Sequence, residues 1–205
     1  EAPAGTRIST QSISGNVTVN GITGELSVNT TSGDVEITGA TRLTSATAVS
    51  GDVTLRDVSA QGLLEASTVS GDVVLTGGKA RRVVLSSISG GVAARGIDAD
   101  EVTLKSTSDD VVFDGNLSAR GSYTFSSHSG DVRISISGQT GFSLEADTFS
   151  GSVRTDFPIK VTTLASRRSR ARTITGTFGD GSAVISATSF SGSVVVTKKS
   201  EHRRD

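Results

Sequence analysis

The sequence predicts an all-β protein, a parallel β-solenoid of about ten coils with about 20 residues each. Its residues are mostly small or β-branched, with no Cys, Met or Trp and only two Pro. A Ser-Gly-Asp-Val tetrapeptide and its variants recur along the chain, and apolar and polar residues alternate on both sides of each copy. Because Val and Thr favour strands while Gly, Ser and Asp favour turns, a helical bundle or a doubly wound α/β domain is disfavoured.

The tetrapeptide sets the period of the solenoid. Its serines, called the corner serines below, are Ser14, Ser32, Ser50, Ser70, Ser89, Ser108, Ser129, Ser150 and Ser191. Neighbouring corner serines are 18 to 21 residues apart up to Ser150, and the last interval of 41 residues is about two periods. A unit of this size cannot bury its apolar face alone, so successive coils are expected to stack in parallel, in-register ladders. We therefore predict one domain over residues 6–198, with an irregular coil at 157–183.

Each coil is predicted to contain two strands joined by a tight turn. Inward positions lie six and four residues before the corner serine and three and five residues after it. These positions hold Val, Leu, Ile and other apolar residues in most coils, and Thr10, Thr44 and Thr155 take three of them. The turn glycine is explained by a backbone site of positive φ, where Asp109, its one replacement, is among the least costly residues.

A small residue, usually with a hydroxyl, stands two positions before each corner serine. The members of this hydroxyl column are Ser12, Thr30, Ala48, Thr68, Ser87, Ser106, Ser127, Thr148 and Ser189. Small side chains let the backbone turn. Each hydroxyl is expected to bond either the backbone of a neighbouring coil or the equivalent hydroxyl there.

The third residue of the tetrapeptide forms a column of carboxylates. This Asp column consists of Asp34, Asp52, Asp72, Asp110 and Asp131. Stacked carboxylates bind Ca²⁺ in some glycine-rich repeats, but those repeats have a period of nine residues. A turn Asp that caps its own backbone is the simpler interpretation. We therefore expect no metal and no cofactor, and the absence of Cys excludes thiolate chemistry and zinc ribbons.

Charge is unevenly distributed along the chain. Residues 1–153 contain 10 Lys and Arg against 17 Asp and Glu, whereas residues 154–205 contain 10 against 4. A rod with an acidic end and a basic end is expected. Candidate contacts for an anionic glycan or lipid surface are Arg167, Arg168, Arg170 and Arg172, followed by a basic tail at 199–205. The alternative is that these charges only keep the end of the solenoid soluble.

Two further observations concern partners. Val74, Ala93 and Val112 take outward positions in consecutive coils, and Val84 lies outward on a neighbouring face. An exposed ridge of this kind marks a partner or weak homodimer surface, unless the residues are merely scattered. Nucleic acid is not an expected partner, because the chain has one Tyr and no Trp to stack on bases.

The repeated T-x-S-G-D-V-x-L signature resembles that of the DUF4097 family, bacterial adhesin-like proteins with β-strand repeats. Phe157-Pro158, the Arg-rich residues 167–172, and the blocks at 175–181 and 188–194 follow the order of that family, and the resemblance covers nearly the whole chain. It implies a right-handed parallel β-helix, a place outside the cytoplasmic membrane, and no catalytic residues. Residues 1–5 are then expected to be a leader remnant or a linker.

The function expected from these observations is a non-enzymatic, extracytoplasmic interaction module of the adhesin type, whether periplasmic, surface-exposed or secreted. Its expected partner is an anionic glycan, a lipid surface or another envelope protein. The alternative is a polysaccharide-active enzyme of the pectate-lyase-like solenoid type. Coil lengths leave no room for cleft-walling loops outside 157–183, and His128 stands where other coils have Ile, Val or Phe, so we expect it to pack at the corner.

Overall fold

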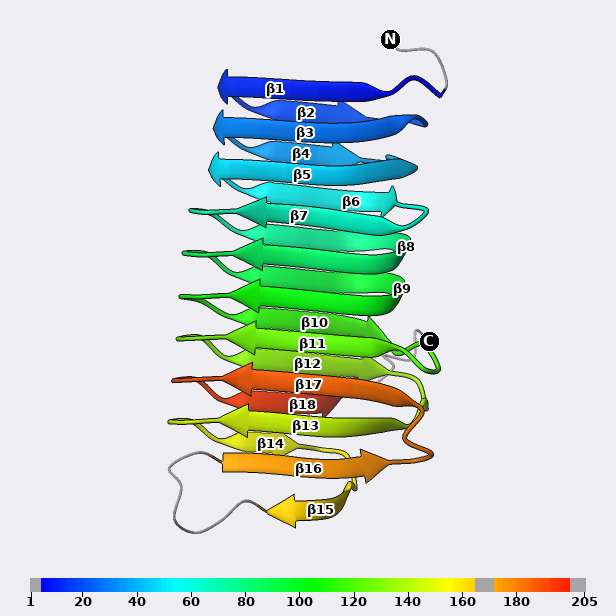
Figure 1. The fold of residues 1–205 in the computed structure, drawn as a ribbon, viewed down its shortest axis with the longest axis vertical. Coiled ribbons are helices and arrows are strands. Elements are labelled where there is room, and N and C mark those ends of the chain that lie inside the picture. The colour runs from blue at the N-terminus through cyan, green and yellow to red at the C-terminus, as the bar shows by residue number, and fades with distance from the viewer. Residues whose placement is uncertain (1–4, 165–171, 200–205) are drawn as a thin grey trace, which may run out of the picture.

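The computed structural model describes residues 5–164 and 172–199, which form a parallel β-solenoid (Figure 1). The strands are β1 Ile8–Ser14, β2 Val17–Asn20, β3 Glu25–Ser32, β4 Val35–Thr38, β5 Arg42–Ser50, β6 Val53–Ser59, β7 Leu63–Thr68, β8 Val73–Ser87, β9 Val92–Ser106, β10 Val111–Asn116, β11 Ser122–Ser127, β12 Val132–Ser137, β13 Phe142–Thr148, β14 Val153–Thr155, β15 Lys160–Leu164, β16 Arg172–Phe178, β17 Ala183–Ser189 and β18 Val194–Lys198. The predicted fold class is confirmed. No helix in the described ranges is long and apolar enough to cross a membrane.

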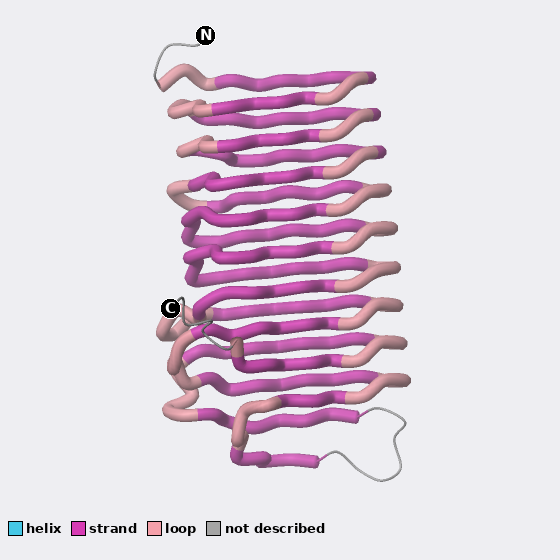
Figure 2. Tube along the Cα trace, turned by 180° about the vertical axis from the view of Figure 1, so that it is seen from behind, coloured by secondary structure: helices cyan, strands magenta, loops and turns pink. Residues whose placement is uncertain are grey.

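Each coil runs along one sheet, turns at the corner serine and returns along the opposite sheet. Val17, Val35 and Val53 are register partners on β2, β4 and β6, one per coil. The corner turns form an unbroken column of loops on one side of the rod (Figure 2). On the other side β8 and β9 continue through the bend as strands of 15 residues. The predicted alternation of buried and exposed side chains is confirmed, because inward residues such as Leu55 are fully buried.

The prediction that Thr44 points inward is wrong. The β3–β5 ladder shifts register between Leu26 and Ser27, so that Leu26 pairs with Leu43 and Ser27 pairs with Ser45. Leu43 is fully buried, while Thr44 is exposed and donates its hydroxyl to the carbonyl oxygen of Leu26 at 2.8 Å. A bulge of one residue exchanges the two side chains between the faces, as the two-residue period of a strand requires.

The coils do not stack in chain order at the C-terminal end. The coil of β17 and β18 lies between the coil of β11 and β12 and the coil of β13 and β14 (Figure 1). Ile185, for example, pairs with Tyr123 on one side and Leu144 on the other. The expectation of strictly successive stacking is therefore wrong for the last coil.

The segment at 157–183 does not contribute a parallel coil. β16 pairs antiparallel with β13, and β15 pairs antiparallel with β16. The structure consequently has fewer parallel coils than the ten predicted.

Intercalation also changes the charge distribution predicted for the rod. Lys199 follows β18 in the interior of the stack, and its Nζ lies 2.7 Å from Asp114 Oδ1 of β10. Lys199 therefore contacts a carboxylate of an earlier coil and does not lie at the end of the stack. The prediction that Lys199, the first residue of the basic tail, belongs to a basic end of the rod is wrong.

Candidate interaction surface

The corner is held by the hydroxyl column, as the sequence predicts. Ser106 is buried, donates to the carbonyl oxygen of Gly90 in the adjacent coil at 2.8 Å, and accepts the N–H of Asp109 at 3.1 Å. Ser87, Ser127, Thr148 and Ser189 make the same pair of bonds. Each of these hydroxyls therefore satisfies two backbone groups at the bend, one of them in the neighbouring coil.

Close approach of neighbouring coils, more than positive φ, explains the turn glycines. Gly15, Gly33, Gly51 and Gly71 have positive φ, but the turn glycines of the later coils do not, and neither does Asp109. A Cβ added to Gly192 would lie 2.1 Å from the carbonyl oxygen of Gly130. The positive-φ explanation is thus correct only for the first four turns, whereas backbone contact between coils recurs from Gly33 onward.

The Asp column caps the next coil rather than its own, which corrects the sequence interpretation. Asp34 Oδ1 accepts the backbone N–H of Asp52 at 3.0 Å, and Asp52 Oδ1 accepts that of Asp72 at 2.8 Å. Asn16 Oδ1 accepts the backbone N–H of Asp34 in the same way, at 3.0 Å. One oxygen of each of these carboxylates therefore accepts a backbone hydrogen bond. In the described ranges, no group of three His, Cys, Asp or Glu is arranged to hold a metal ion.

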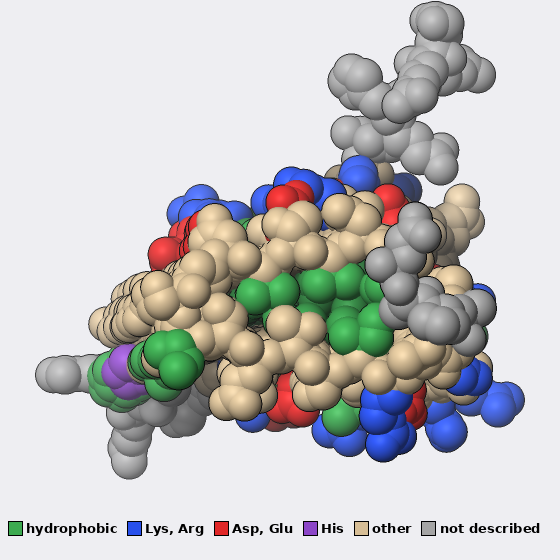
Figure 3. Space-filling view, turned by 90° about the horizontal axis from the view of Figure 1, so that it is seen from above, with side chains coloured by type: hydrophobic (Ala, Val, Ile, Leu, Met, Phe, Trp, Pro, Cys, Tyr) green, Lys and Arg blue, Asp and Glu red, His purple; other side chains and the backbone are tan. Residues whose placement is uncertain are grey.

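The residue directly before each corner serine projects outward and forms a line along the rod, called the corner ridge. Its members, in spatial order, are Ile13, Thr31, Val49, Val69, Ile88, Thr107, His128, Phe190 and Phe149. Of the eight exposed large apolar residues in the described ranges, six belong to this ridge. Eight intervals of about 4.8 Å give it a length of about 40 Å. Figure 3 shows these apolar side chains and a histidine gathered at one corner of the rod.

Three aromatic rings close the ridge at its C-terminal end. The rings of His128 and Phe190 are stacked with centroids 4.8 Å apart, and those of Phe190 and Phe149 with centroids 4.9 Å apart. The interplanar angles are 9° and 3°, so the stack follows the spacing between coils. His128 lies at the corner as predicted. Its exposed ring stacks on an exposed ring and is not packed in the core.

The polarity beside the ridge differs between its two ends. Exposed Asp34, Asp52 and Asp72 lie three residues after Thr31, Val49 and Val69. In the coils of Phe190 and Phe149 that position holds Ser193 and Ser152. Phe190 and Phe149 therefore lack the flanking carboxylate that accompanies Val49 and Val69, whereas His128 is followed by Asp131.

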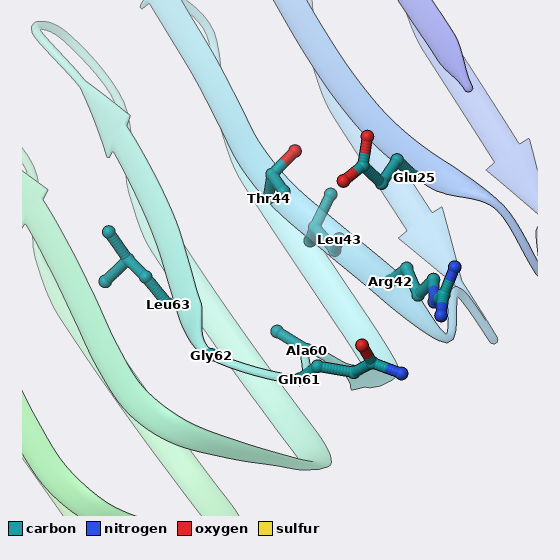
Figure 4. Close-up of a pocket in the computed structure, with 8 residues that line it drawn as sticks. All are labelled: Glu25, Arg42, Leu43, Thr44, Ala60, Gln61, Gly62 and Leu63. Carbon is teal, nitrogen blue, oxygen red and sulfur yellow. The ribbon is translucent and has the colours of Figure 1, made fainter.

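Two of the cavities in the described part of the chain lie on the return side of the rod, opposite the ridge, and are lined by polar and charged residues. The first, about 460 Å³, opens where β5 and β7 are paired only over three residues from Ser45 to Thr47 (Figure 4). Leu43, Ala60 and Leu63 line its apolar part, with Glu25 and Arg42 at the rim.

The second cavity, about 570 Å³, brings together carboxylates and cations. Lys79, Arg81, Asp98 and Asp100 line it. Lys79 Nζ is 3.0 Å from Asp98 Oδ2, and Ser118 Oγ donates to Asp100 Oδ1 at 2.9 Å. All four side chains belong to exposed residues, so the cavity is an open, charged depression suited to a polar ligand.

Comparison with known families decides the classification. The family model described as Toastrack DUF4097 matches residues 25–197. The chain belongs to this family. No curated protein and no solved structure is significantly similar to the chain.

The apolar site residues predicted for this Toastrack chain do not form one exposed surface. Val74, Ala93 and Val112 are aligned in consecutive coils, as predicted. However, Ala93 is only 8% exposed, and Val74, Val112 and Val84 are half-buried, so they form no exposed ridge.

The predicted basic contacts lie at the edge of the described structure. Arg167, Arg168 and Arg170 lie outside the described residues. Arg172 begins β16, but its side chain is also outside the description. The corner ridge was missed as a surface although its residues were visible in the sequence. Its signal was the recurrence of Ile, Val and Phe directly before the corner serine.

Proposed function

We propose that this Toastrack chain is a non-enzymatic, extracytoplasmic interaction module of the adhesin type that presents the corner ridge to a lipid surface of the cell envelope. The observation that carries the proposal is the concentration of exposed apolar side chains on the ridge, which includes Ile88, Phe190 and Phe149. Contiguous exposed apolar residues of this kind mark contact surfaces.

The shape of the ridge favours a lipid partner over a rigid protein groove. It is one residue wide and lies on a convex corner, so a protein partner would need a matching groove about 40 Å long. A bilayer interface accepts a row of apolar side chains without a preformed groove, and aromatic residues are favoured there. The aromatic end is the expected point of entry, because Ser193 and Ser152 replace the flanking carboxylates there.

The test is sedimentation with phosphatidylcholine vesicles, with and without phosphatidylglycerol. We expect the Phe149→Ser/Phe190→Ser variant to bind vesicles at least about tenfold more weakly. Transfer of two Phe side chains from water into the membrane interface contributes a few kcal/mol to binding, and the variant loses this contribution. Val184→Ser is the matched control, because Val184 is 54% exposed but lies away from the ridge. Equal binding of the double variant and the parent chain, or no vesicle binding by the parent chain, would overturn the lipid proposal.

The basic segment is a separate arm of the same experiment. An Arg167/Arg168/Arg170/Arg172→Ala variant should lose only the additional binding given by phosphatidylglycerol, since its charges recognise anionic head groups. If this variant binds both vesicle types like the parent chain, the anionic component of the proposal is discarded. The extracytoplasmic location rests on the family resemblance and is tested by fractionating cells that produce the full-length protein.

One observation favours the alternative of a polysaccharide-active enzyme. The cavity lined by Asp98, Asp100 and Lys79 combines carboxylates with a cation. Incubation with polygalacturonate and calcium, followed by measurement of new reducing ends, tests it. Activity that disappears in Asp98→Asn/Asp100→Asn would favour the enzyme over the interaction module.

A further inference from the structure

The cavity between β5 and β7 lies where the length of the coils changes. Ser32 and Ser50 are 18 residues apart, whereas Ser50 and Ser70 are 20 residues apart. The coil that follows β5 is therefore longer than the coil that precedes it, and the two cannot be matched along their whole length. The ladder between β5 and β7 consequently covers only residues 45–47.

Two strand edges border the cavity. Arg42 and Leu43 of β5 pair with β3, and Leu63 and Leu64 of β7 pair with β8, but no ladder joins these two stretches in the described structure. Backbone N–H and C=O groups along such edges are available to a ligand, as they are at the edge of a sheet. Figure 4 shows the opening between the two strands.

The rim of the cavity has a cation without an ion pair. The charged residues that line the cavity are Glu25 and Arg42. The carboxylate of Glu25 accepts a hydrogen bond from the guanidinium of Arg7, which neutralises it. Arg42 is exposed and takes part in none of the ion pairs among the described residues. The amide of Gln61 lies on the same side of the opening as Arg42 (Figure 4), so this side favours an anionic group.

The wall of the cavity exposes a large apolar side chain. Of the eight exposed large apolar residues in the described ranges, Leu63 and Val184 are the two outside the corner ridge, and Leu63 lines the cavity. Ala60 lines it as well, and Gly62 keeps the entrance open, because no atom lies within 4 Å of the position of a Cβ there. A volume of about 460 Å³ is within the range of pockets that hold small ligands.

We propose that this cavity binds a small organic acid with an apolar body, of the size of a medium-chain carboxylate. The carboxylate accepts hydrogen bonds from Arg42, whose planar guanidinium presents two parallel N–H donors to such a group. The apolar body lies against Leu63 and Ala60, and removal of this surface from water stabilises the complex. Because the cavity is open, the expected dissociation constant for an eight-carbon acid is about 0.1–1 mM.

The first test is titration of the full chain with sodium octanoate, followed by the backbone amide resonances. Resonances of residues 42–44 and 60–63 should shift in a saturable manner. Octylamine has a chain of the same length and a positive charge at neutral pH, so it should bind at least about tenfold more weakly. Acetate, which lacks the apolar body, should give no saturable shift. Equal binding of octanoate and octylamine, or shifts confined to residues outside the cavity, would overturn the proposal.

The second test separates the charged contact from the apolar contact. Arg42→Gln should raise the dissociation constant of octanoate at least about fivefold and remove the preference over octylamine. Arg42→Lys keeps the charge and should keep the preference. Leu63→Ser should weaken octanoate binding at least about threefold and leave the preference for the anion.

Matched controls for these variants are Arg154→Gln and Val184→Ser, at exposed positions away from the cavity. Both should bind octanoate like the parent chain. Since Arg42 and Leu63 are exposed as well, their variants should melt like the parent chain. Unchanged octanoate binding by Arg42→Gln, or an equal loss in Arg154→Gln, would contradict the site.

The cavity and the lipid contact of the ridge can be tested independently. Phe149→Ser/Phe190→Ser changes the opposite side of the rod and should bind octanoate like the parent chain. Arg42→Gln should in turn bind vesicles like the parent chain. Loss of octanoate binding in the ridge variant would show that the acyl chain binds to the ridge, and would overturn the cavity as its site.

Discussion

Asp109 supplies the hydrogen-bond acceptor that Gly91 lacks. In the neighbouring coils each side chain of the Asp column accepts a backbone N–H of the next coil, as Asp110 Oδ1 accepts the N–H of Asp131 at 2.7 Å. Gly91 has no side chain that could accept the backbone N–H of Asp110. Asp109 Oδ1 accepts this N–H instead, at 2.7 Å. Two departures from the repeat, one in the Asp position and one in the glycine position, therefore compensate each other at one point of the corner.

This compensation predicts non-additive mutations. Asp109→Gly should lower the free energy of unfolding by about 1 kcal/mol, because it removes a charged acceptor from a backbone N–H and adds chain entropy to the unfolded state. Gly91→Asp in the same chain should restore the loss, since a Cβ at Gly91 has its nearest neighbour at 3.5 Å. Urea unfolding of both single variants and the double variant measures the coupling.

Asp109→Asn is the control in that series, because its side-chain oxygen keeps the acceptor, and it should unfold like the parent chain. Additive effects of Gly91→Asp and Asp109→Gly would show that the two residues do not serve the same N–H.

The glycine column predicts a sharp contrast between two Gly→Ala substitutions. A Cβ on Gly71 would lie 2.2 Å from the carbonyl oxygen of Gly51, and Gly71 has a φ of +149°. Gly71→Ala should therefore cost about 2–4 kcal/mol of stability. Gly62 has no atom within 4 Å of its Cβ position and no positive φ, so Gly62→Ala should be neutral or slightly stabilising. Chemical denaturation of both variants checks this, and equal losses would contradict the contact between coils.

The local construction of the fold could be predicted from the sequence because it repeats. The repeat period gives the position of every corner serine. The hydroxyl column indicates that small polar side chains form hydrogen bonds with the backbone groups at the bend, as Ser106 does. Thr44 was misplaced because one extra residue in β5 shifts the alternation, and a shift inside a coil leaves the spacing between corner serines close to its usual value.

The order of the coils could not be predicted in the same way. All coils present similar edges, so the sequence of β17 fits β11 and β13 equally well, as its register with Tyr123 and Leu144 shows. The ridge was missed for a different reason. Alternation separates inward from outward residues along a strand, but it does not give the exposure of a residue at a convex corner, where Phe190 and Phe149 stand.

Tyr123 predicts a loss of stability at high pH. Its hydroxyl accepts the N–H of Ser118 at 2.7 Å and donates to the carbonyl oxygen of Ala99 at 3.1 Å. Burial is the largest cause and raises the pKa of Tyr123 above its ordinary value of 10.0; the hydrogen bond from the Ser118 N–H opposes this shift, and the nearby charges of Asp100 and Asp98 add to it. The unfolded chain then loses this proton first as the pH rises. The contribution of the protonated Tyr123 hydroxyl to the free energy of unfolding is therefore fully present below pH 10.0. It is lost as the pH rises through the raised pKa of Tyr123 in the folded state.

Urea unfolding of the parent chain and Tyr123→Phe on both sides of that pH measures the effect. The phenylalanine variant should be less stable by about 1 kcal/mol at neutral pH, because it loses two hydrogen bonds, and its stability should fall less steeply at high pH. Tyr123 is the only Tyr and the chain has no Trp, so the ultraviolet absorption of the phenolate reports its titration directly. An unshifted titration in the folded protein would contradict the prediction.

The intercalated coil predicts that the two ends of the chain differ in their importance for folding. β17 pairs with β11 and β13 at once, and β18 pairs with β12 and β14. A chain ending at Ser182 would therefore lose a coil from inside the stack and leave two ladders open. We expect it to lose cooperative unfolding and to become sensitive to proteolysis throughout residues 142–182. A chain beginning at Glu25 loses only an end coil and should unfold cooperatively with a smaller free energy, as repeat proteins do when one terminal unit is removed. Circular dichroism melts and limited proteolysis of both truncations distinguish these outcomes. Cooperative melting of the chain ending at Ser182 would show that β13 can dock directly on β11, and that the intercalated coil is dispensable.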